Sequence, residues 1–298
     1  MWIDKLQPLT DIFDWLHQAW ERPRTQRRVA LLIFWVYVAA LVGIELNRQG
    51  FLSPSLAVRT PRSHFAAIHL AFTLILGLEV MGLIFSISSS ISRSVGKQFE
   101  ILTLILLRNA FKELSALPEP VSVVGNLEPI LHIAVSGSGA LCVFACLCVY
   151  MRLFRPQRFI HKPEMRMRYV MSKKLLSLTL FVIFFCLAAR DVWLFFRGGF
   201  SHNFFETIYT VLIFADIALV LIAQRYMPTF QAVFRNSGFV IGTLLMRLAL
   251  SAPPPWDTAV SVAAALYVLA LTWVTNYFSR PVIESEEKKT TPPEEEVA

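Results

Sequence analysis

Long runs of apolar side chains, broken by few charges, dominate this chain. Residues 29–44 contain no charged side chain, residues 131–150 contain only His132, and residues 259–278 are again uncharged. Each run approaches the roughly 20 apolar residues with which an α-helix crosses the hydrocarbon core of a bilayer. The apolar positions fill these runs instead of recurring on one helical face, which separates them from the amphipathic helices of water-soluble domains. The pattern therefore predicts an all-α integral membrane protein.

The apolar pattern predicts about eight transmembrane helices. The seventh is the shortest and ends at the segment Ser-Ala-Pro-Pro-Pro, so whether it crosses the bilayer completely is left open. Residues 282–298 are charged and rich in proline, a composition that is typical of a disordered tail. The expected spans are residues 29–46, 64–90, 98–116, 129–151, 173–196, 205–224, 237–251 and 257–278.

Residues 1–28 precede the first span and are predicted to lie in the cytoplasm. Ile12, Phe13 and Trp20 fall on one broad helical face, and a basic segment follows them. An amphipathic helix next to basic residues is typical of a segment that lies in the membrane surface. We expect such a surface helix here, with packing against the helix bundle as the alternative.

Composition and charge agree with a membrane protein. Only 16% of the residues are charged and 55% are apolar, whereas a soluble domain usually has about a quarter charged residues. The net charge of +7 does not point to a nucleic-acid partner, because the basic residues collect in the loops at one side of the predicted membrane. Since cytoplasmic loops are rich in Lys and Arg, both termini are predicted to be cytoplasmic.

The loop between the fourth and fifth spans is notably basic. Clusters of Lys and Arg next to a membrane attract the anionic head groups of the cytoplasmic leaflet. Anionic lipids of the bilayer are therefore the expected partners of this basic loop. Its basic residues are Arg152, Arg155, Arg158, Lys162, Arg166, Arg168, Lys173 and Lys174.

The second half of the chain repeats motifs of the first. The second span reads TLILGLEVMGLI and the sixth reads TVLIFADIALVL, so Glu79 corresponds to Asp216, six residues after a threonine in each. The third span reads ILTLILLRNAF and the seventh reads VIGTLLMRLAL, with Arg108 and Arg247 in matching places. The shared order of these motifs predicts an internal duplication.

The duplication divides the chain into two four-helix repeats. They are residues 29–156 and residues 173–281, joined by a basic cytoplasmic linker, residues 157–172. Four spans return the chain to the side of the membrane on which it started, so both repeats have the same direction. We expect them to be related by a pseudo-two-fold axis along the membrane normal, as in the parallel repeats of some transporters.

Two acids and two arginines lie inside predicted spans. A lone charge in the hydrocarbon core costs several kcal/mol or more, whereas a carboxylate and a guanidinium neutralise each other through paired hydrogen bonds. We expect Glu79 to pair with Arg108 and Asp216 to pair with Arg247, unless the pairs cross between the repeats. Such pairs either fix the register of neighbouring helices or line a path for an ion or proton.

No motif points to catalysis or to a cofactor. The sequence shows no phosphate-binding loop, dinucleotide fingerprint or nucleophile–base arrangement, so we do not expect an enzyme. His64 and His69 do not share a helical face, which argues against a metal site. The four cysteines lie within apolar runs, where they act as small apolar side chains. They are Cys142, Cys146, Cys148 and Cys186.

Four motifs in the second repeat carry a family resemblance. They are FADIALVL with its acid, IGTLLMRLAL with Arg247, WDTAV and LALTWVTNYFSR, in that order. Residues 205–280 thereby resemble the phosphate-starvation-inducible E (PsiE-like) family of small four-span proteins. The resemblance implies a four-helix module in the bacterial inner membrane, of which the acid and the arginine are part. It implies no substrate, and the first repeat matches only through the duplication, which would make this chain a fused pseudo-dimer.

Two functions are expected from these patterns. The first is a small-ion or proton channel or transporter that uses the paired charges near the membrane midplane. The alternative is a non-conducting membrane module or stress-response scaffold, which acts through a partner protein or lipid by way of the basic loop and the N-terminal helix. A conducting protein needs a polar cavity that reaches the midplane, whereas a scaffold needs dry, fully paired charges. The ion, the stimulus and a possible homo-oligomer stay open.

Overall fold

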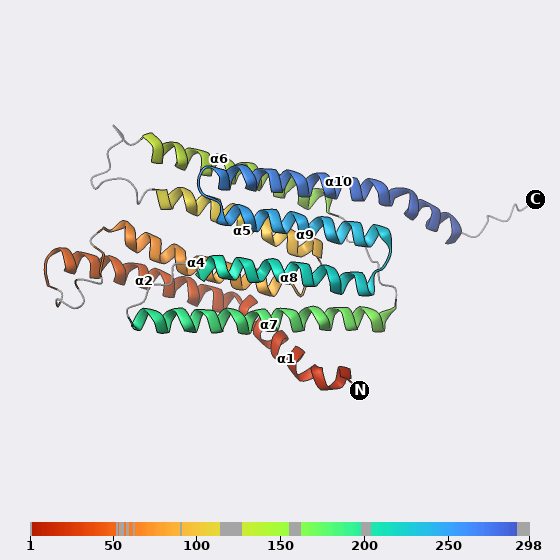
Figure 1. Ribbon diagram of the computed structural model, residues 1–298, viewed down its shortest axis with the longest axis horizontal. Helices are drawn as coiled ribbons and strands as arrows, with labels where there is room; N and C mark the ends of the chain where they lie inside the picture. The colour runs from red at the N-terminus through yellow and green to blue at the C-terminus, as the bar shows by residue number, and fades with distance from the viewer. Residues whose placement is uncertain are drawn as a thin grey trace, which may run out of the picture.

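The computed structural model of the chain is a bundle of long α-helices (Figure 1). It describes residues 2–51, 53, 57, 60–61, 63–89, 91–113, 127–154, 162–197 and 204–290, and these residues contain helices but no strand. The helices are α1 (Trp2–Glu21), α2 (Pro23–Arg48), α4 (Phe65–Ser86), α5 (Ile91–Glu113), α6 (Leu127–Leu153), α7 (Pro163–Phe196), α8 (Phe204–Tyr226), α9 (Phe230–Ser251) and α10 (Trp256–Thr290).

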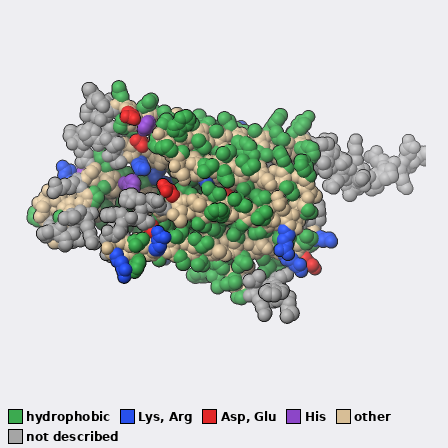
Figure 2. Space-filling model, in the orientation of Figure 1, with side chains coloured by type: hydrophobic (Ala, Val, Ile, Leu, Met, Phe, Trp, Pro, Cys, Tyr) green, Lys and Arg blue, Asp and Glu red, His purple; other side chains and the backbone are tan. Residues whose placement is uncertain are grey.

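Seven of the described helices are long and apolar enough to cross a membrane, namely α2, α4, α6, α7, α8, α9 and α10. In α10 the apolar stretch ends at Phe278, before the helix does. Figure 2 shows hydrophobic side chains over the middle of the visible face, with charged side chains gathered toward its two ends. Length, composition and surface together define an all-α integral membrane protein.

Helix α5, which covers the third expected span, is not among these seven helices because charges interrupt it. It lies within the bundle nonetheless, packed against α4, α6 and α9. Its apolar side chains Phe99 and Leu102 are fully buried, and the polar side chain of Gln98 is buried with them. Gln98 and Arg108 of α5 are buried against other helices, whereas its exposed charged residues Arg93, Lys97 and Lys112 lie toward the two ends of the helix.

The helices form two layers that follow chain order. In one layer α2, α4, α5 and α6 pack each against the next, and in the other α7, α8, α9 and α10 do the same. Across the layers α6 packs on α10, α5 on α9, and α4 on α7. Figure 1 shows α5 running beside α9, and α6 beside α10. The two repeats therefore share one internal arrangement.

This stacking differs from the expected pseudo-two-fold axis along the membrane normal. Rotation about such an axis reverses the order of one layer against the other, which would set α5 against α10 and α6 against α9. The main contacts instead join each of these helices to its own counterpart, α5 to α9 and α6 to α10. The repeats are thus related by a sideways shift more nearly than by a two-fold rotation.

The two ends of the bundle contain different segments. The end with α1, the end of α6, the start of α7 and the last turns of α10 is here called the proximal end (Figure 1). The distal end contains the start of α4, the end of α7 and the turn between α9 and α10. Both ends of the described chain therefore lie at the proximal end of the bundle.

Helix α1 packs on the bundle at the proximal end. Phe13 is 2% exposed, and its ring centroid lies 5.8 Å from that of Phe85 on α4. Lys174 of α7 donates a hydrogen bond to Asp14 Oδ2 at 2.6 Å. Of the two placements expected for the N-terminal helix, the structure thus shows packing against the other helices.

The seventh span starts earlier than expected. Helix α9 begins at Phe230, seven residues before the predicted boundary, and its 22 residues are enough to cross a bilayer. The sequence suggested a polar loop at this place, but Arg235 and Asn236 are buried between helices. Arg235 Nη2 donates a hydrogen bond to Ser92 Oγ of α5 at 3.0 Å, so a charge that suggested a loop is part of the helix packing.

Two other boundaries also differ from the sequence expectation. Helix α7 begins at Pro163, so residues 163–172 of the expected linker are helical. Helix α10 continues to Thr290, so residues 282–290 of the expected disordered tail are helical as well. This last stretch is rich in Glu and Lys, which are good helix formers even where no apolar core supports them.

Small residues allow the two repeats to approach closely. A Cβ added to Gly139 of α6 would lie 2.1 Å from Thr258 Cγ2 of α10. Within the second repeat, a Cβ added to Gly242 of α9 would lie 2.3 Å from Val268 Cγ2 of α10. Lipid tails are as apolar as leucine, so helices in a membrane associate through such tight van der Waals packing.

Gly139→Ala is expected to destabilise the contact between the repeats. The added methyl group overlaps Thr258, and overpacking of this kind typically costs about 1–3 kcal/mol. Gly137 on the same helix has nothing within 4 Å of an added Cβ, so Gly137→Ala is the matched control. Thermal unfolding in detergent should give a lower melting temperature for Gly139→Ala alone. Equal melting temperatures for both variants would contradict the close packing of α6 on α10.

Candidate functional site

The second repeat holds the carboxylate of Asp216 in a dry pair with several bonds. Asp216 lies in the middle of α8 and Arg247 faces it from α9, and each residue is 2% exposed. Arg247 Nη1 lies 3.1 Å from Asp216 Oδ2, and Arg247 Nη2 donates to Oδ1 at 3.1 Å. Thr243 Oγ1, one turn earlier on α9, donates to Oδ2 at 2.8 Å. Two nitrogens and one hydroxyl therefore satisfy both carboxylate oxygens away from solvent.

The first repeat holds a looser pair. Arg108 Nη2 of α5 donates a hydrogen bond to Glu79 Oε2 of α4. These two side chains are 9% and 12% exposed, against 2% and 3% in the second pair. Leu104 stands one turn before Arg108, in the place that Thr243 takes before Arg247, and a leucine cannot donate a hydrogen bond. The Glu79 carboxylate is therefore less buried and less supported than that of Asp216.

Both pairs lie within their own repeat and join its second helix to its third, α4 to α5 and α8 to α9. The crossed arrangement that the sequence left open is not the one observed. Tyr209 of α8 is buried and lines the same cavity as Arg108 of the first pair. The sequence analysis did not single out Tyr209, because one tyrosine in an apolar span carries no motif.

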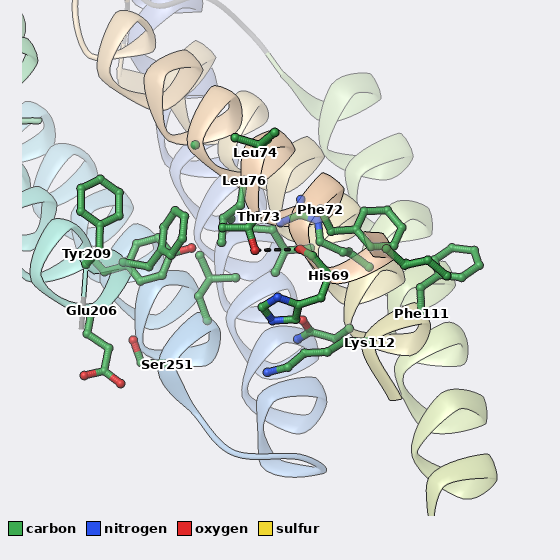
Figure 3. Close-up of a pocket in the computed structure, with 18 of the residues that line it drawn as sticks. His69, Phe72, Thr73, Leu74, Leu76, Phe111, Lys112, Glu206, Tyr209 and Ser251 are labelled. Atoms are coloured by element: carbon green, nitrogen blue, oxygen red, sulfur yellow. Dashed lines mark hydrogen bonds between the residues drawn. The ribbon is translucent and has the colours of Figure 1, made fainter. Parts of the chain in front are cut away.

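A cavity of about 1050 Å³ enters the bundle at the distal end (Figure 3). It lies between α4, α5, α7 and α8, next to the turn that follows α9. Its lining on α4 extends from Phe65 to Gly77, a stretch of about 18 Å at the rise of an α-helix. Arg108 and Tyr209 are part of the lining, whereas Asp216 and Arg247 are not. The cavity therefore reaches the first charge pair at Arg108, while Glu79 is not part of the lining.

Charged side chains of opposite sign line different walls of this cavity. Helices α4 and α5 contribute His69, Arg108 and Lys112. Helices α7 and α8 contribute Asp191 and Glu206. Figure 3 shows His69 and Lys112 close together, with Glu206 on the other side of the view. Arg108 was predicted as a functional charge, but its grouping with the other residues was not, since they come from four helices and share no motif.

Asp257 of the WDTAV motif has a structural role beside the cavity. Its Oδ1 accepts a hydrogen bond from the backbone N–H of Thr258 at 2.7 Å, at the start of α10, where backbone donors lack helical partners. Its Oδ2 accepts a hydrogen bond from Asn109 Nδ2 of α5 at 3.0 Å. Since Asn109 follows Arg108 and lines the cavity, this bond ties the first repeat to the second next to the looser pair.

The basic loop is partly exposed at the proximal end. Arg155 and Arg158 lie outside the described residues. The other basic residues before residue 170 are exposed at the end of α6 and around the start of α7, where they are open to lipid head groups or to a partner. They are Arg152, Lys162, Arg166 and Arg168.

Lys173 and Lys174 do not belong to this exposed surface, which corrects the expectation. Lys173 is 2% exposed, and its Nζ donates to the backbone carbonyl of Ser89, just after α4 ends. The ammonium group thereby satisfies a carbonyl that lies beyond the regular hydrogen bonds of the helix. Lys174 is held by Asp14 of α1. Both lysines fasten neighbouring segments together.

The part of the chain that the structure describes gives no support for a metal site or for a disulfide bond. Among those residues, no group of three or more His, Cys, Asp or Glu side chains could hold a metal ion. The four cysteines are free thiols, and three of them are exposed on the apolar surface. The charge pairs and the cavity are therefore the features on which a function can be argued.

Comparison with known proteins adds no assignment. No family model, no curated protein and no solved structure matches the chain. The resemblance to the PsiE-like family stays a prediction that rests on its motifs. The class that fold and site define is a multi-pass, all-α membrane protein with two internal charge pairs and a cavity that reaches one of them.

Asp216→Asn is expected to destabilise the protein strongly. The amide keeps the size of the side chain but leaves the charge of Arg247 buried without a carboxylate. Removing one partner of a buried pair typically costs about 3–5 kcal/mol. The double variant Asp216→Leu with Arg247→Met should recover part of this loss, because apolar replacement of both partners is often tolerated. Thermal unfolding in detergent measures both effects, and a melting temperature of Asp216→Asn equal to wild type would refute the stabilising role.

Proposed function

We propose that this protein moves a small ion or a proton across the membrane, with the Glu79–Arg108 pair as its working charges. The observation that supports the proposal is the cavity, which extends from the distal end of the bundle to Arg108. Buried ionisable groups in membrane proteins commonly mark such paths. Water and ions that enter the cavity reach one charge pair without unfolding any helix.

Protonation of Glu79 would change the local balance of charge. A neutral carboxyl group no longer attracts Arg108, which stays a cation because guanidinium does not lose its proton in proteins. The single hydrogen bond between them is easier to break than the set of bonds around Asp216. Arg108 would then move within the cavity that it already lines, so that proton uptake is coupled to a movement at its inner wall.

The proximal end favours a transporter over an open channel. Below the first pair, the ring of Phe85 lies 5.8 Å from Phe13 and 5.2 Å from Phe181, measured between centroids. Lys173 binds the carbonyl of Ser89 beside this aromatic cluster. A path from the cavity to the proximal end therefore requires these contacts to open, which suits a protein that exposes its site to one side at a time.

The alternative function, a non-conducting module or scaffold, is favoured by the second pair. Asp216 and Arg247 are buried away from solvent, and both carboxylate oxygens of Asp216 are paired, as expected of a structural pair. A scaffold would work through the exposed basic residues at the proximal end and through α1. We further propose that this proximal end faces the cytoplasm at the inner membrane of a bacterium. Basic side chains and both chain ends share it, in agreement with the distribution of Lys and Arg in such proteins.

Glu79→Gln is expected to abolish flux without unfolding the protein. Proton flux is measured in liposomes with an imposed potassium gradient and an internal pH-sensitive dye. Wild type should move protons, and Glu79→Gln should move them at least about tenfold more slowly. That change corresponds to about 1.4 kcal/mol in the barrier. Glu100→Gln is the matched control, because Glu100 pairs only with Lys97 at the exposed start of α5.

The melting temperature and the monodispersity of each variant show whether a loss of flux results from a loss of the folded structure. Wild type that moves neither protons nor potassium, while it remains monodisperse, would overturn the proposal and favour the scaffold. Equal flux in wild type and Glu79→Gln would exclude Glu79 from the path.

A further inference from the structure

We propose that the distal cavity is a binding site for an amphipathic zwitterion, that is, a molecule with an ammonium group and an acid group a few ångström apart on an apolar body. This inference concerns binding, so it does not require that the protein conducts. It rests on the sign of the charges on each wall, on the aromatic side chains beside them and on the volume of the cavity.

The two charged walls are built by helical spacing. On α5, Arg108 and Lys112 are four residues apart, which places them on one helical face toward the cavity. His69 of α4 lies beside Lys112 on the same side of the cavity (Figure 3). On α8, Glu206 and Tyr209 are three residues apart and likewise share a face. A basic wall therefore stands across from a wall with acidic groups.

Aromatic side chains flank both walls. Phe72 of α4 stacks on Phe111 of α5 with ring centroids 5.7 Å apart, beside the basic wall. Phe204 and Phe205 of α8 meet edge to face at 5.0 Å, beside Glu206. Apolar and aromatic lining with a few polar groups is the usual construction of a site for an organic molecule, and the volume of about 1050 Å³ is at the upper end of such sites.

Ligands of other classes fit this lining less well. A bare cation is held by several oxygen ligands in a small space, whereas this cavity is wide and largely apolar. An organic ion of one sign would be attracted by one wall and repelled by the other. A zwitterion places its acid group toward Arg108 and Lys112 and its ammonium group toward Glu206 and Asp191, so both walls act in the same direction.

Two sources offer this chemistry, and both can reach the site. One is a free amino acid with an apolar side chain, which would enter from water between Lys112 and Glu206, both exposed at the distal end. The other is the phosphoethanolamine head group of a lipid. Leu74 and Phe111 of the lining are 38% and 45% exposed on the apolar surface, which offers a route from the bilayer.

The test is equilibrium binding to the purified full chain in a maltoside detergent, which carries no charged head group. L-phenylalanine, phenethylamine and 3-phenylpropionate share one apolar body and differ only in charge. Dihexanoylphosphatidylethanolamine and dihexanoylphosphatidylglycerol form the lipid arm. We expect L-phenylalanine or the ethanolamine lipid to bind at least about tenfold more tightly than its singly charged counterparts, and the arm that does so identifies the source.

Two variants test which wall of the cavity binds which charged group of the ligand. Glu206→Gln should weaken binding of the zwitterion about tenfold but not weaken binding of 3-phenylpropionate, because the ammonium contact is lost and a repulsion of the anion is removed. Lys112→Gln should weaken binding of the zwitterion and of 3-phenylpropionate but not weaken binding of phenethylamine. Glu164→Gln is the control, since Glu164 is exposed at the start of α7 and does not line the cavity.

The inference is overturned if neither zwitterion binds saturably to monodisperse protein, or if singly charged probes bind as tightly. It is also overturned if both wall variants bind like wild type. Flux without zwitterion binding would overturn this inference alone, and binding without flux would overturn the proposed transport alone, so the two failures are distinguishable.

Discussion

The hydrocarbon core of a membrane contains no water that could solvate a buried charge. This constraint determines how the helices of the bundle are arranged. A carboxylate in the middle of a membrane helix is tolerated only beside an opposite charge at the same depth. The acid of α4 therefore holds that helix against α5 through Arg108, and the acid of α8 holds that helix against α9 through Arg247. Each pair sets both the rotation and the axial position of two neighbours. The close packing of α6 on α10 and of α9 on α10 then acts on helices that are already in register.

The same constraint is met in two different ways, and the difference separates structure from activity. In the second repeat, Thr243 and both terminal nitrogens of Arg247 surround the carboxylate. In the first repeat the position of the threonine is taken by Leu104, and one hydrogen bond joins the pair beside a cavity. A duplicated module can keep one copy as a fixed contact while the other copy is exposed to solvent. The second pair is the more buried and better bonded of the two, and the first is the one whose arginine lines the cavity.

Much of the fold could be predicted from the sequence because charged residues are rare within its apolar segments and are therefore informative. Asp216 and Arg247 are charged residues within apolar segments. The free-energy cost of a lone charge in the membrane was therefore enough to predict that each is paired with an opposite charge. Polar residues that lie between helices are harder, because their burial depends on neighbours far away in the chain. Arg235 looked like part of a loop and Lys173 like part of a lipid-facing surface, yet both are buried by contacts with segments that no local pattern identifies. The cavity was beyond reach for the same reason, since four helices supply its walls.

The two ends of the bundle have opposite character, and this asymmetry has a physical consequence. At the distal end, charges of both signs line a cavity that reaches the first pair. At the proximal end, Phe13 of α1 closes over Phe85 of α4, and the charge of Lys174 holds α1 in place through Asp14. Glu79 and Phe85 lie six residues apart on α4, about 9 Å along its axis. One short segment of α4 therefore carries both the acid of the first pair and the ring against which α1 is packed.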